Sequence, residues 1–391
     1  MPIIERIAAL KEEMTALRHD LHQHPETAFQ EHRTAALVAR KLREFGADEV
    51  HEGIARTGVV GTIRAGTGTR AIALRADMDA LALEEKNDLP YRSCHEGRMH
   101  ACGHDGHTAM LLGAARYLAE SRNFDGAVHL IFQPAEEAAG GGRVMVEEGL
   151  FERFPAEAVF GLHNRPGLPP GRFAIRPGPI MAGMDYFDLA ITGRGAHSAR
   201  PETGIDAVVT AAHIVVALQT IVSRNIGALD SAVVSVTQIH GGDAYNVIPE
   251  DVMLKGTVRA YRPDLLARLE QAMRRIAEGV AASLGASARL DYHKGYPPLV
   301  NHPDETRWAA DVASEIAGEA GVDREGEPIM ASEDFAFMLE RTPGAFIFLG
   351  NGEGEGGCEL HNPRYNFNDD ILPVGASYFA RLVETKLARG P

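Results

Sequence analysis

The sequence lacks the features that mark secreted and membrane-spanning proteins. It contains three cysteines, Cys94, Cys102 and Cys358, which are too few for a disulfide framework. Its first twenty residues show no basic region followed by an apolar stretch, so we expect no signal peptide. It also has no uninterrupted apolar stretch of about 18 residues, so we expect no membrane span. Together these absences predict a cytoplasmic protein with no membrane partner.

The sequence also contains fewer basic than acidic residues. The chain has 39 Lys and Arg against 54 Asp and Glu, a net charge of -15, which disfavours nucleic acid and anionic membranes as partners. This balance does not exclude a locally positive site, because bound metal ions can create one inside an acidic protein. A length of 391 residues with 45% hydrophobic content predicts two domains, each with a buried core.

The outer parts of the chain follow the order strand, polar loop, helix. Residues 4–45 have helical periodicity, interrupted at Pro25, and another helix is expected over 108–121. Apolar strands are expected at 71–74, 127–132 and 158–162, and each leads into acidic residues or a histidine. This order predicts an α/β sheet, and such sheets place their chemistry at the carboxyl ends of the strands.

The pattern changes between residues 184 and 292. Strands and two long helices, one over 204–224 and one starting at Pro263, give the order βαββαβ of a ferredoxin-like unit. After residue 297 the α/β pattern resumes. We therefore expect one discontinuous domain over 1–183 and 293–391, with a second domain inserted over 184–292.

Four separate segments supply side chains of the kind that bind metal ions. The segment 99–107, MHACGHDGH, offers imidazole and thiolate within six residues. Taken alone, it favours a metal site over a buried cysteine beside solvated histidines. The pair Glu136–Glu137 could be a ligand and a base or a solvated acidic turn, while His163 and His361, each alone, are typical of hydrogen-bonded core residues. Because an α/β sheet would gather all four segments at one edge, their combination favours a metal site.

Several motifs resemble one branch of a known family. Residues 75–80 (RADMDA), 99–107 (MHACGHDGH), 134–137 (PAEE), 195–198 (GAHS), 332–335 (SEDF) and 360–363 (LHNP) are similar to those of the hippurate hydrolase and aminoacylase branch of the dinuclear metallopeptidases. The plant auxin-conjugate amidohydrolases share this branch. The resemblance extends from about residue 18 to 382. It implies an enzyme that hydrolyses the amide bond of small N-acyl amino acids with two divalent metal ions. It also implies that the discontinuous domain is the catalytic domain and that the inserted domain is a lid or dimerisation domain.

The resemblance also implies roles for individual residues. Cys102 would bridge the ions, Glu137 and His361 would complete one, and His104 and His163 the other. Glu136 would be the general base for a water that the ions acidify; the chemistry of the two glutamates alone does not say which has which role. The wider clan has His-x-Asp where this chain has Asp77-Met-Asp79, so the histidine of that motif is absent here. His104 would take its place as a ligand, and Asp79 would orient the ring of His104.

In the inserted domain, the resemblance implies that His197 stabilises the oxyanion, and that Asn246 and Arg259 bind the substrate carboxylate. It further implies a homodimer or higher homo-oligomer, with His197 reaching the partner's metals. His22 and His24 are expected to be structural, and His107 to support the ligands or begin a helix.

Three alternatives stay open at this point: a dipeptidase, a deacetylase of a biosynthetic intermediate, or a catalytically silent protein that binds metal and carboxylate. The ligand set is compatible with Zn, Mn, Co or Ni. The sequence does not identify the acyl group of the substrate.

Overall fold

The computed structural model describes residues 3–137, 140–353 and 358–390 and divides into two compact units. The first comprises Met1–Ile180, Val300–Glu327 and Asp334–Pro391, and the second comprises Met181–Leu299 and Pro328–Glu333. The second unit therefore extends beyond the expected 184–292 at both ends and includes a short distant segment. That segment belongs there because the amide of Ala182 donates to the carbonyls of Ile329 and Ala331 at 3.1 and 3.0 Å.

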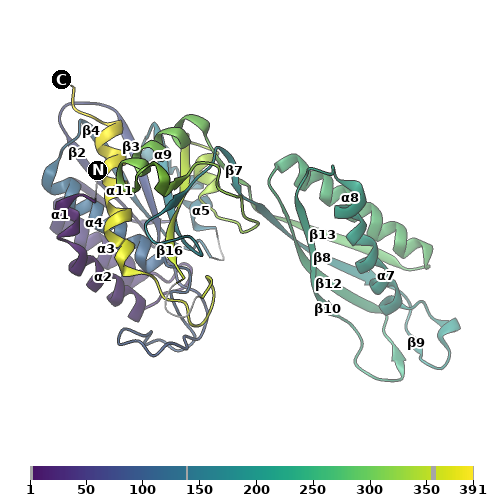
Figure 1. The fold of residues 1–391 in the computed structure, drawn as a ribbon. Helices are drawn as coiled ribbons and strands as arrows, with labels where there is room; N and C mark the ends of the chain where they lie inside the picture. Colours follow the sequence, from purple (N-terminus) through teal and green to yellow (C-terminus); the bar gives the residue numbers. More distant parts are fainter. Residues whose placement is uncertain (1–2, 138–139, 354–357, 391) are drawn as a thin grey trace. The chain divides into compact units, whose positions relative to one another are not determined.

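An eight-stranded sheet forms the centre of the first unit (Figure 1). In spatial order its strands are β1 (Glu49–Ile54), β2 (Gly58–Ala65), β4 (Gly126–Gln133), β3 (Ala71–Asp77), β5 (Ala158–Pro166), β16 (Gly344–Gly352), β6 (Phe173–Ala174) and β15 (Val322–Asp323). The four central strands, β4, β3, β5 and β16, run parallel, so their carboxyl ends lie along one edge. Nearly every residue of these four strands is buried, as expected of strands covered on both faces.

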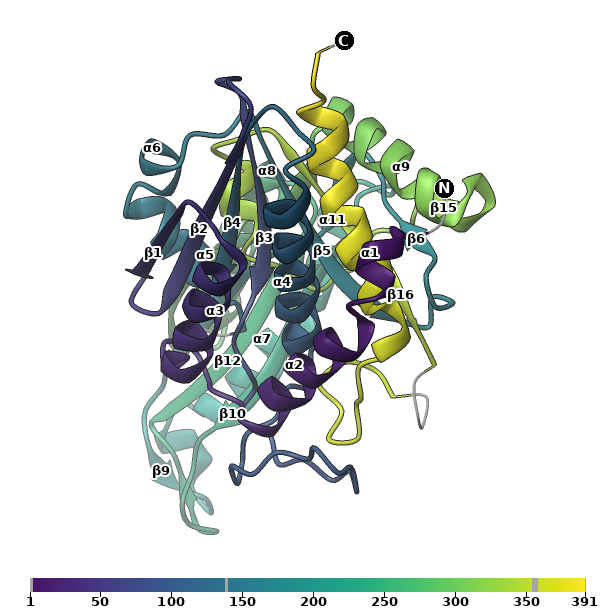
Figure 2. The same cartoon turned by 90° about the vertical axis from the view of Figure 1, so that its left-hand side faces the viewer.

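Helices cover this sheet. Figure 2 shows α2 (Lys11–Gln23), α3 (His32–Phe45), α4 (His104–Ser121) and α11 (Leu372–Lys386) together in front of it, with α4 packed against the other three. Further helices are α1 (Glu5–Ala8), α5 (Gly141–Glu147), α6 (Leu150–Arg153), α9 (Pro303–Ala317) and α10 (Ala336–Leu339). In α3, Ala35, Val38, Ala39 and Leu42 recur at helical spacing and are buried, and the helix ends at Gly46, whose φ of 90° suits glycine.

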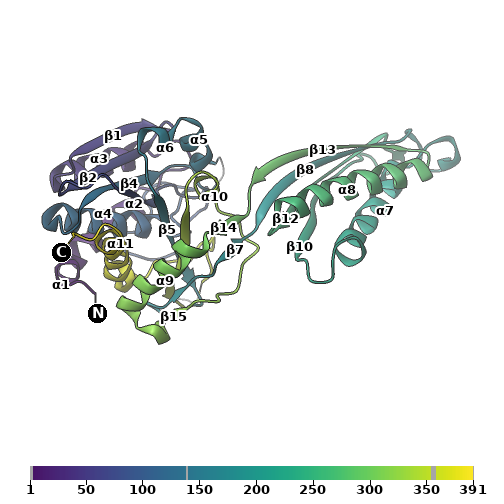
Figure 3. The ribbon, with the colours of Figure 1, turned by 90° about the horizontal axis from the view of Figure 1, so that it is seen from above.

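The second unit is a four-stranded antiparallel sheet with two helices, and it confirms the ferredoxin-like order. Its elements are β8 (Gly183–Thr192), α7 (Ala207–Thr220), β10 (Ala232–His240), β12 (Asp251–Ala260), α8 (Pro263–Ser283) and β13 (Ser287–Tyr296), with the sheet order β10-β12-β8-β13. The two helices pack against each other and against the sheet (Figure 3). This unit has its own hydrophobic core, separate from that of the first.

Two short strands, β9 (Ala196–His197) and β11 (Val247–Ile248), form a separate ribbon in the second unit. The strand β7 (Gly178–Met181) pairs with β14 (Leu299–Asn301), and the chain passes from one unit to the other within these two strands.

The helix α7 continues through a π-helical turn at Ile221–Asn225. The stretch Ala207–Asn225 is, by length and composition alone, long and apolar enough to cross a membrane, with a mean hydropathy of 1.5. One face of α7 packs Ala211, Ile214 and Leu218 into the core of the unit. Val209 and Val216 on its other face are 48% and 70% exposed. The core helix of a soluble protein can have the same length and composition, so a single such helix is weak evidence for a membrane span.

Candidate metal centre

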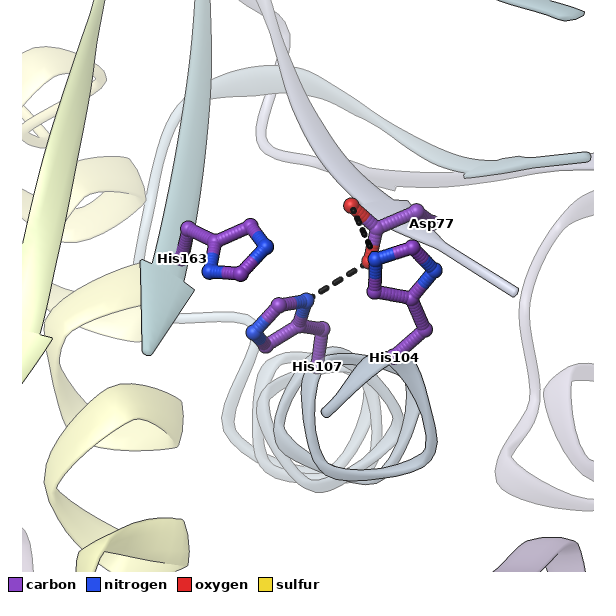
Figure 4. A group of neighbouring side chains, drawn as sticks. All are labelled: Asp77, His104, His107 and His163. Atoms are coloured by element: carbon purple, nitrogen blue, oxygen red, sulfur yellow. Dashed lines mark hydrogen bonds and ion pairs between the residues drawn. The ribbon is translucent and has the colours of Figure 1, made fainter. Parts of the chain in front are cut away.

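The candidate centre forms where the parallel strands end. Asp77 is the last residue of β3, and Glu136 and Glu137 follow the end of β4 by a few residues. His163 lies within β5, which continues to Pro166 rather than ending at residue 162 as expected. Because these strands are neighbours in the sheet, their side chains meet at its edge, and Figure 4 shows His104, His107 and His163 gathered around Asp77.

The start of α4 brings two histidines into this cluster. The helix begins at His104, four residues earlier than expected, after Gly103 in a left-handed conformation with φ of 93°. A Cβ at Gly103 would lie 2.4 Å from Oδ1 of Asn164, so only glycine allows this approach. His107, one turn later, contacts Asp77 at 2.6 Å through Nδ1 and Asn164 at 2.7 Å through Nε2, and is therefore a supporting residue.

Cys102, Glu137 and His361 form a second group, whose ligand atoms all lie within 4.8 Å of one another. Nε2 of His361 lies 3.3 Å from Oε2 of Glu137. The amide of His361 donates to the carbonyl of Ala101, which brings this distant segment beside Cys102. Burial, together with the charges of Glu137 and Glu136, raises the pKa of the Cys102 thiol well above its usual range.

His163 is held in the form that a metal ligand requires. Its Nδ1 donates to the carbonyl of Asn164 at 2.7 Å, which leaves the lone pair of Nε2 facing Sγ of Cys102 at 3.5 Å. Burial and the neighbouring His107 lower its pKa well below the usual range, so the ring is neutral. A backbone carbonyl that fixes the tautomer in this way is a common support for a metal-binding histidine.

Asp79 contacts both halves of the centre. Its Oδ1 lies 3.2 Å from Nδ1 of His104, and its Oδ2 accepts from the amide of Glu137 at 3.0 Å. Burial opposes a charge on His104, but Asp77 and the hydrogen bond to Asp79 outweigh it and raise its pKa to about 10. The expected orienting role of Asp79 is therefore accompanied by a second contact, to the backbone of Glu137.

These residues fit a pair of divalent cations. Nε2 of His104 and Oε1 of Glu137 are buried 3.8 Å apart, and within the described ranges neither atom has a hydrogen-bond partner. Glu136 joins both residues in an overlapping cluster of possible ligand atoms. A thiol, two carboxylates and three imidazoles in this space form a donor set that cations would satisfy and that is unfavourable without them.

The three predicted substrate residues lie in the second unit. His197 is in β9, and the amide of the next residue, Ser198, donates to the carbonyl of Asn246 at 3.0 Å, so His197 and Asn246 lie in adjoining segments. Arg259 lies elsewhere, on β12. Its Nη1 donates to the carbonyl of Met330 at 2.7 Å and to Oγ of Ser332 at 3.2 Å. Burial lowers the pKa of Arg259, and in the described part of the chain no carboxylate lies within 4 Å of it.

The expected structural histidines are accounted for by other contacts. His22 is buried, with its Nδ1 2.9 Å from Oδ2 of Asp105 and its Nε2 3.2 Å from Oε1 of Glu85. The contact with Asp105 connects α2 to the start of α4. Nδ1 of His24 bonds to the carbonyl of Asp20.

Sequence reasoning missed two residues that support the centre. Asn164 connects His107 to Tyr365 through its side-chain amide, which donates to the tyrosine oxygen at 2.6 Å. The only signal for Asn164 was its place directly after His163 in the motif Gly161-Leu-His-Asn164, and no local signal marked Tyr365.

Comparison with known proteins identifies relatives that include a metal-binding peptidase. Over its whole length the chain is similar to the hippurate hydrolase of Campylobacter jejuni, with 44% identity covering 98% of both proteins. It is 40% identical to an N-acetyl-L-cysteine deacetylase of Bacillus subtilis, covering 95% of this chain and 88% of that protein. A solved structure from Bacillus subtilis, described as a dinuclear metal binding peptidase of the M20 family, matches with a TM-score of 0.84, 35% identity and coverage of 97% and 99%. Residues 73–385 match the model of peptidase family M20/M25/M40. The family expected from the motifs is confirmed: the chain belongs to peptidase family M20/M25/M40.

Proposed function

We propose that this protein hydrolyses the amide bond of small N-acyl amino acids that carry a free carboxylate. The observation that carries the proposal is the convergence of Cys102, His104, Glu137, His163 and His361 beside a further carboxylate, Glu136. The names of the relatives from Campylobacter jejuni and Bacillus subtilis support an N-acyl amino acid as the substrate class.

Within this proposal, Cys102, His104, Glu137, His163 and His361 would hold two divalent ions, which would supply Lewis acidity for the amide carbonyl and for a water molecule. Glu136 accepts the proton of the attacking water and then donates it to the leaving nitrogen. Asp79 holds the ring of His104 and the backbone of Glu137 in place during this transfer. His197 donates a hydrogen bond to the oxyanion of the tetrahedral intermediate.

Substrate selection in this proposal depends on the free carboxylate. Arg259 has a half-buried guanidinium whose described partners, Met330 and Ser332, are both neutral, so a substrate carboxylate would provide its missing counter-charge. Asn246 would contribute an amide donor. A peptidase, such as a dipeptidase, is the second candidate, because a relative from Saccharolobus solfataricus that is 36% identical is named a thermostable carboxypeptidase.

The donor set supports zinc, manganese, cobalt or nickel as the pair of ions. A count of only three cysteines supports a reducing compartment, and we propose the cytoplasm. We further propose a homodimer formed by the second unit, because the outer face of α7 exposes valines and β10 is an edge strand.

The test is a panel of N-acyl amino acids and dipeptides, assayed after metal removal and re-addition of one metal at a time. Glu136→Gln should abolish turnover, by at least a thousandfold in kcat, while two ions stay bound, because a base is not needed to hold them. The matched control is Glu137→Gln, which should lose metal as well as activity. Metal analysis of both variants decides: loss of an ion from Glu136→Gln alone would mean that the two glutamates have exchanged roles.

A further inference from the structure

Glu31 is a buried acid in the loop between α2 and α3, outside every motif that marked the metal centre. Its carboxylate accepts three hydrogen bonds from three different segments. Oε1 accepts from the amides of Phe29 at 3.0 Å and Ala135 at 2.9 Å, and Oε2 accepts from the hydroxyl of Thr57 at 2.6 Å. One side chain thus joins the loop before α3, the turn before β2 and the turn after β4.

All three segments contain backbone in the left-handed region, which is unfavourable for residues other than glycine. The φ angles are 59° at Phe29, 55° at Ala135, and 48° and 75° at Ala55 and Arg56, directly before Thr57. Six non-glycine residues in the described chain have positive φ, and these are four of them. The carboxylate of Glu31 therefore lies where three strained turns meet.

Of these turns, the one at Ala135 leads directly into Glu136. The conformation of Ala135 sets the direction in which the chain, and with it the side chain of Glu136, enters the metal centre. The next residue is held independently, since the amide of Glu137 donates to Asp79. The two adjacent glutamates thus have separate anchors, Glu31 for the first and Asp79 for the second.

We propose that Glu31 is a positioning residue: its carboxylate holds the turn at Ala135 left-handed and thereby fixes the carboxylate of Glu136. This inference rests on the proposed function of Glu136 as general base. Without the acceptor, the turn would relax towards negative φ and displace the base, and displacements of about 1 Å cost catalysis heavily. Metal binding would be preserved because Asp79 still holds Glu137.

The experiment compares Glu31→Ala with Glu31→Gln in the metal-loaded, full-length protein. Glu31→Ala should lower kcat by about tenfold or more, change KM by less than about threefold, and retain both ions. Glu31→Gln should stay within about threefold of wild type, because its amide oxygen can accept from the same two N–H groups. The matched control is Glu26→Ala: Glu26 lies in the same loop, and within the described residues its carboxylate accepts from the amides of Arg33 and Thr34 and not from the Ala135 turn.

A second variant separates positioning from general destabilisation. Ala135→Gly should rescue Glu31→Ala at least threefold in kcat, because glycine adopts positive φ without the Cβ penalty and keeps the turn without its anchor. Because glycine also relieves backbone strain, the rescue indicates positioning only if kcat recovers without a gain in the free energy of unfolding. If Glu31→Ala does not fold, Glu31→Asp replaces it: the shorter side chain cannot reach all three donors and should show the same loss and the same rescue.

Deuterium uptake by the peptide containing Ala135 provides a readout that does not need turnover. Uptake should be faster in Glu31→Ala and unchanged in Glu31→Gln and Glu26→Ala. Equal losses of kcat in the alanine and glutamine variants, loss of an ion from Glu31→Ala, or no rescue by Ala135→Gly would each overturn the inference. Failure of the proposed function would appear differently, as a wild-type protein without turnover on the panel, and the uptake measurement would still decide whether Glu31 holds the turn.

Discussion

At the scale of single residues, the metal centre brings together groups that are unfavourable neighbours without cations. The thiol of Cys102 is buried beside carboxylates, which keeps it protonated, and His104 is surrounded by acids, which keeps it charged. Both groups must lose a proton before they can bind a metal. The protonation of the ion-free centre is therefore coupled to metal loading.

This coupling predicts proton release. Loading the metal-free protein at pH 7 should release about two protons, one from Cys102 and one from His104, and the apparent binding constant should rise about a hundredfold per pH unit near neutrality. Calorimetric titrations in buffers of different ionisation enthalpy measure the number directly. Cys102→Ser should release about one proton and bind metal more weakly, whereas the exposed Cys94→Ser should behave as wild type. Heats that do not depend on the buffer would remove Cys102 and His104 from the ligand set.

A second prediction at this scale concerns Arg259. Arg259→Ala should weaken kcat/KM for substrates with a free carboxylate by about 1.5–3 kcal/mol, the usual contribution of a charge-assisted hydrogen bond. Amide or ester analogues of the same substrates should be affected much less. Ser332→Ala, which removes only one described contact of the guanidinium, is the control. It should prefer substrates with a free carboxylate over their neutral analogues as strongly as wild type does. Equal losses on charged and neutral substrates would identify a structural role for Arg259.

The sequence predicted the ligand-type residues better than the residues that hold them. Cys102, His104 and Glu137 lie in compact motifs whose chemistry is visible locally. Glu31 and Tyr365 act through contacts with residues roughly a hundred or more positions away, such as Ala135 and Asn164. Nothing in a local pattern distinguishes such an acid or tyrosine from an ordinary loop or core residue.

At the scale of elements, strongly patterned segments were predicted and weakly patterned ones were not. The buried strands β3 and β4 follow from their apolar runs, and the amphipathic helices α3 and α8 follow from their periodicity. The strands β1, β2 and β16 were not specified in advance. The strand β2 is almost wholly buried, but its sequence, GVVGTIRA, has neither a long apolar run nor a regular alternation. Helix α4 was expected to begin too late, because its first turn is made of the polar residues of the centre.

The pairing of β2 with β4 leads to a prediction about pH. His129 of β4 is buried beside the Thr62 hydroxyl, at 2.9 Å from Nδ1, and burial lowers its pKa to about 4. Between pH 6.5 and 4 the unfolded chain therefore binds a proton that the folded chain does not, so stability falls as pH falls through this window. The contribution is at most about 3 kcal/mol.

His129→Gln keeps a polar partner for Thr62 but cannot titrate. Its free energy of unfolding, measured in urea, should fall less than that of wild type between pH 6.5 and 4. The difference between the two decreases should approach about 3 kcal/mol. His51→Gln on β1, which is separated from β4 by β2, is the control and should follow wild type. Parallel curves for His129→Gln and wild type would mean that the buried ring does not resist protonation.

At the scale of the whole molecule, the chain consists of two units with separate cores, joined by chain crossings near residues 181 and 299 and around the segment Pro328–Glu333. The predicted ligands and Glu136 belong to the first unit. His197, Asn246 and Arg259 belong to the second, whose α7 exposes Val208, Val209 and Val216. This apolar helix face is the basis of the dimer proposed above.

Such a dimer leads to the last prediction, that His197 acts on the active site of the partner subunit. His197→Ala and Glu136→Ala should each be nearly inactive. If they are dissociated together and reassembled, about half of the dimers contain one subunit of each kind. In a mixed dimer with exchanged histidines, one site carries both defects, and the other combines an intact Glu136 with an intact His197. Activity should then recover to roughly a quarter of wild type, whereas a histidine that served its own subunit would leave every site of the mixture defective. Subunit exchange is verified with differently tagged chains, and proven exchange without recovery would contradict action across the dimer.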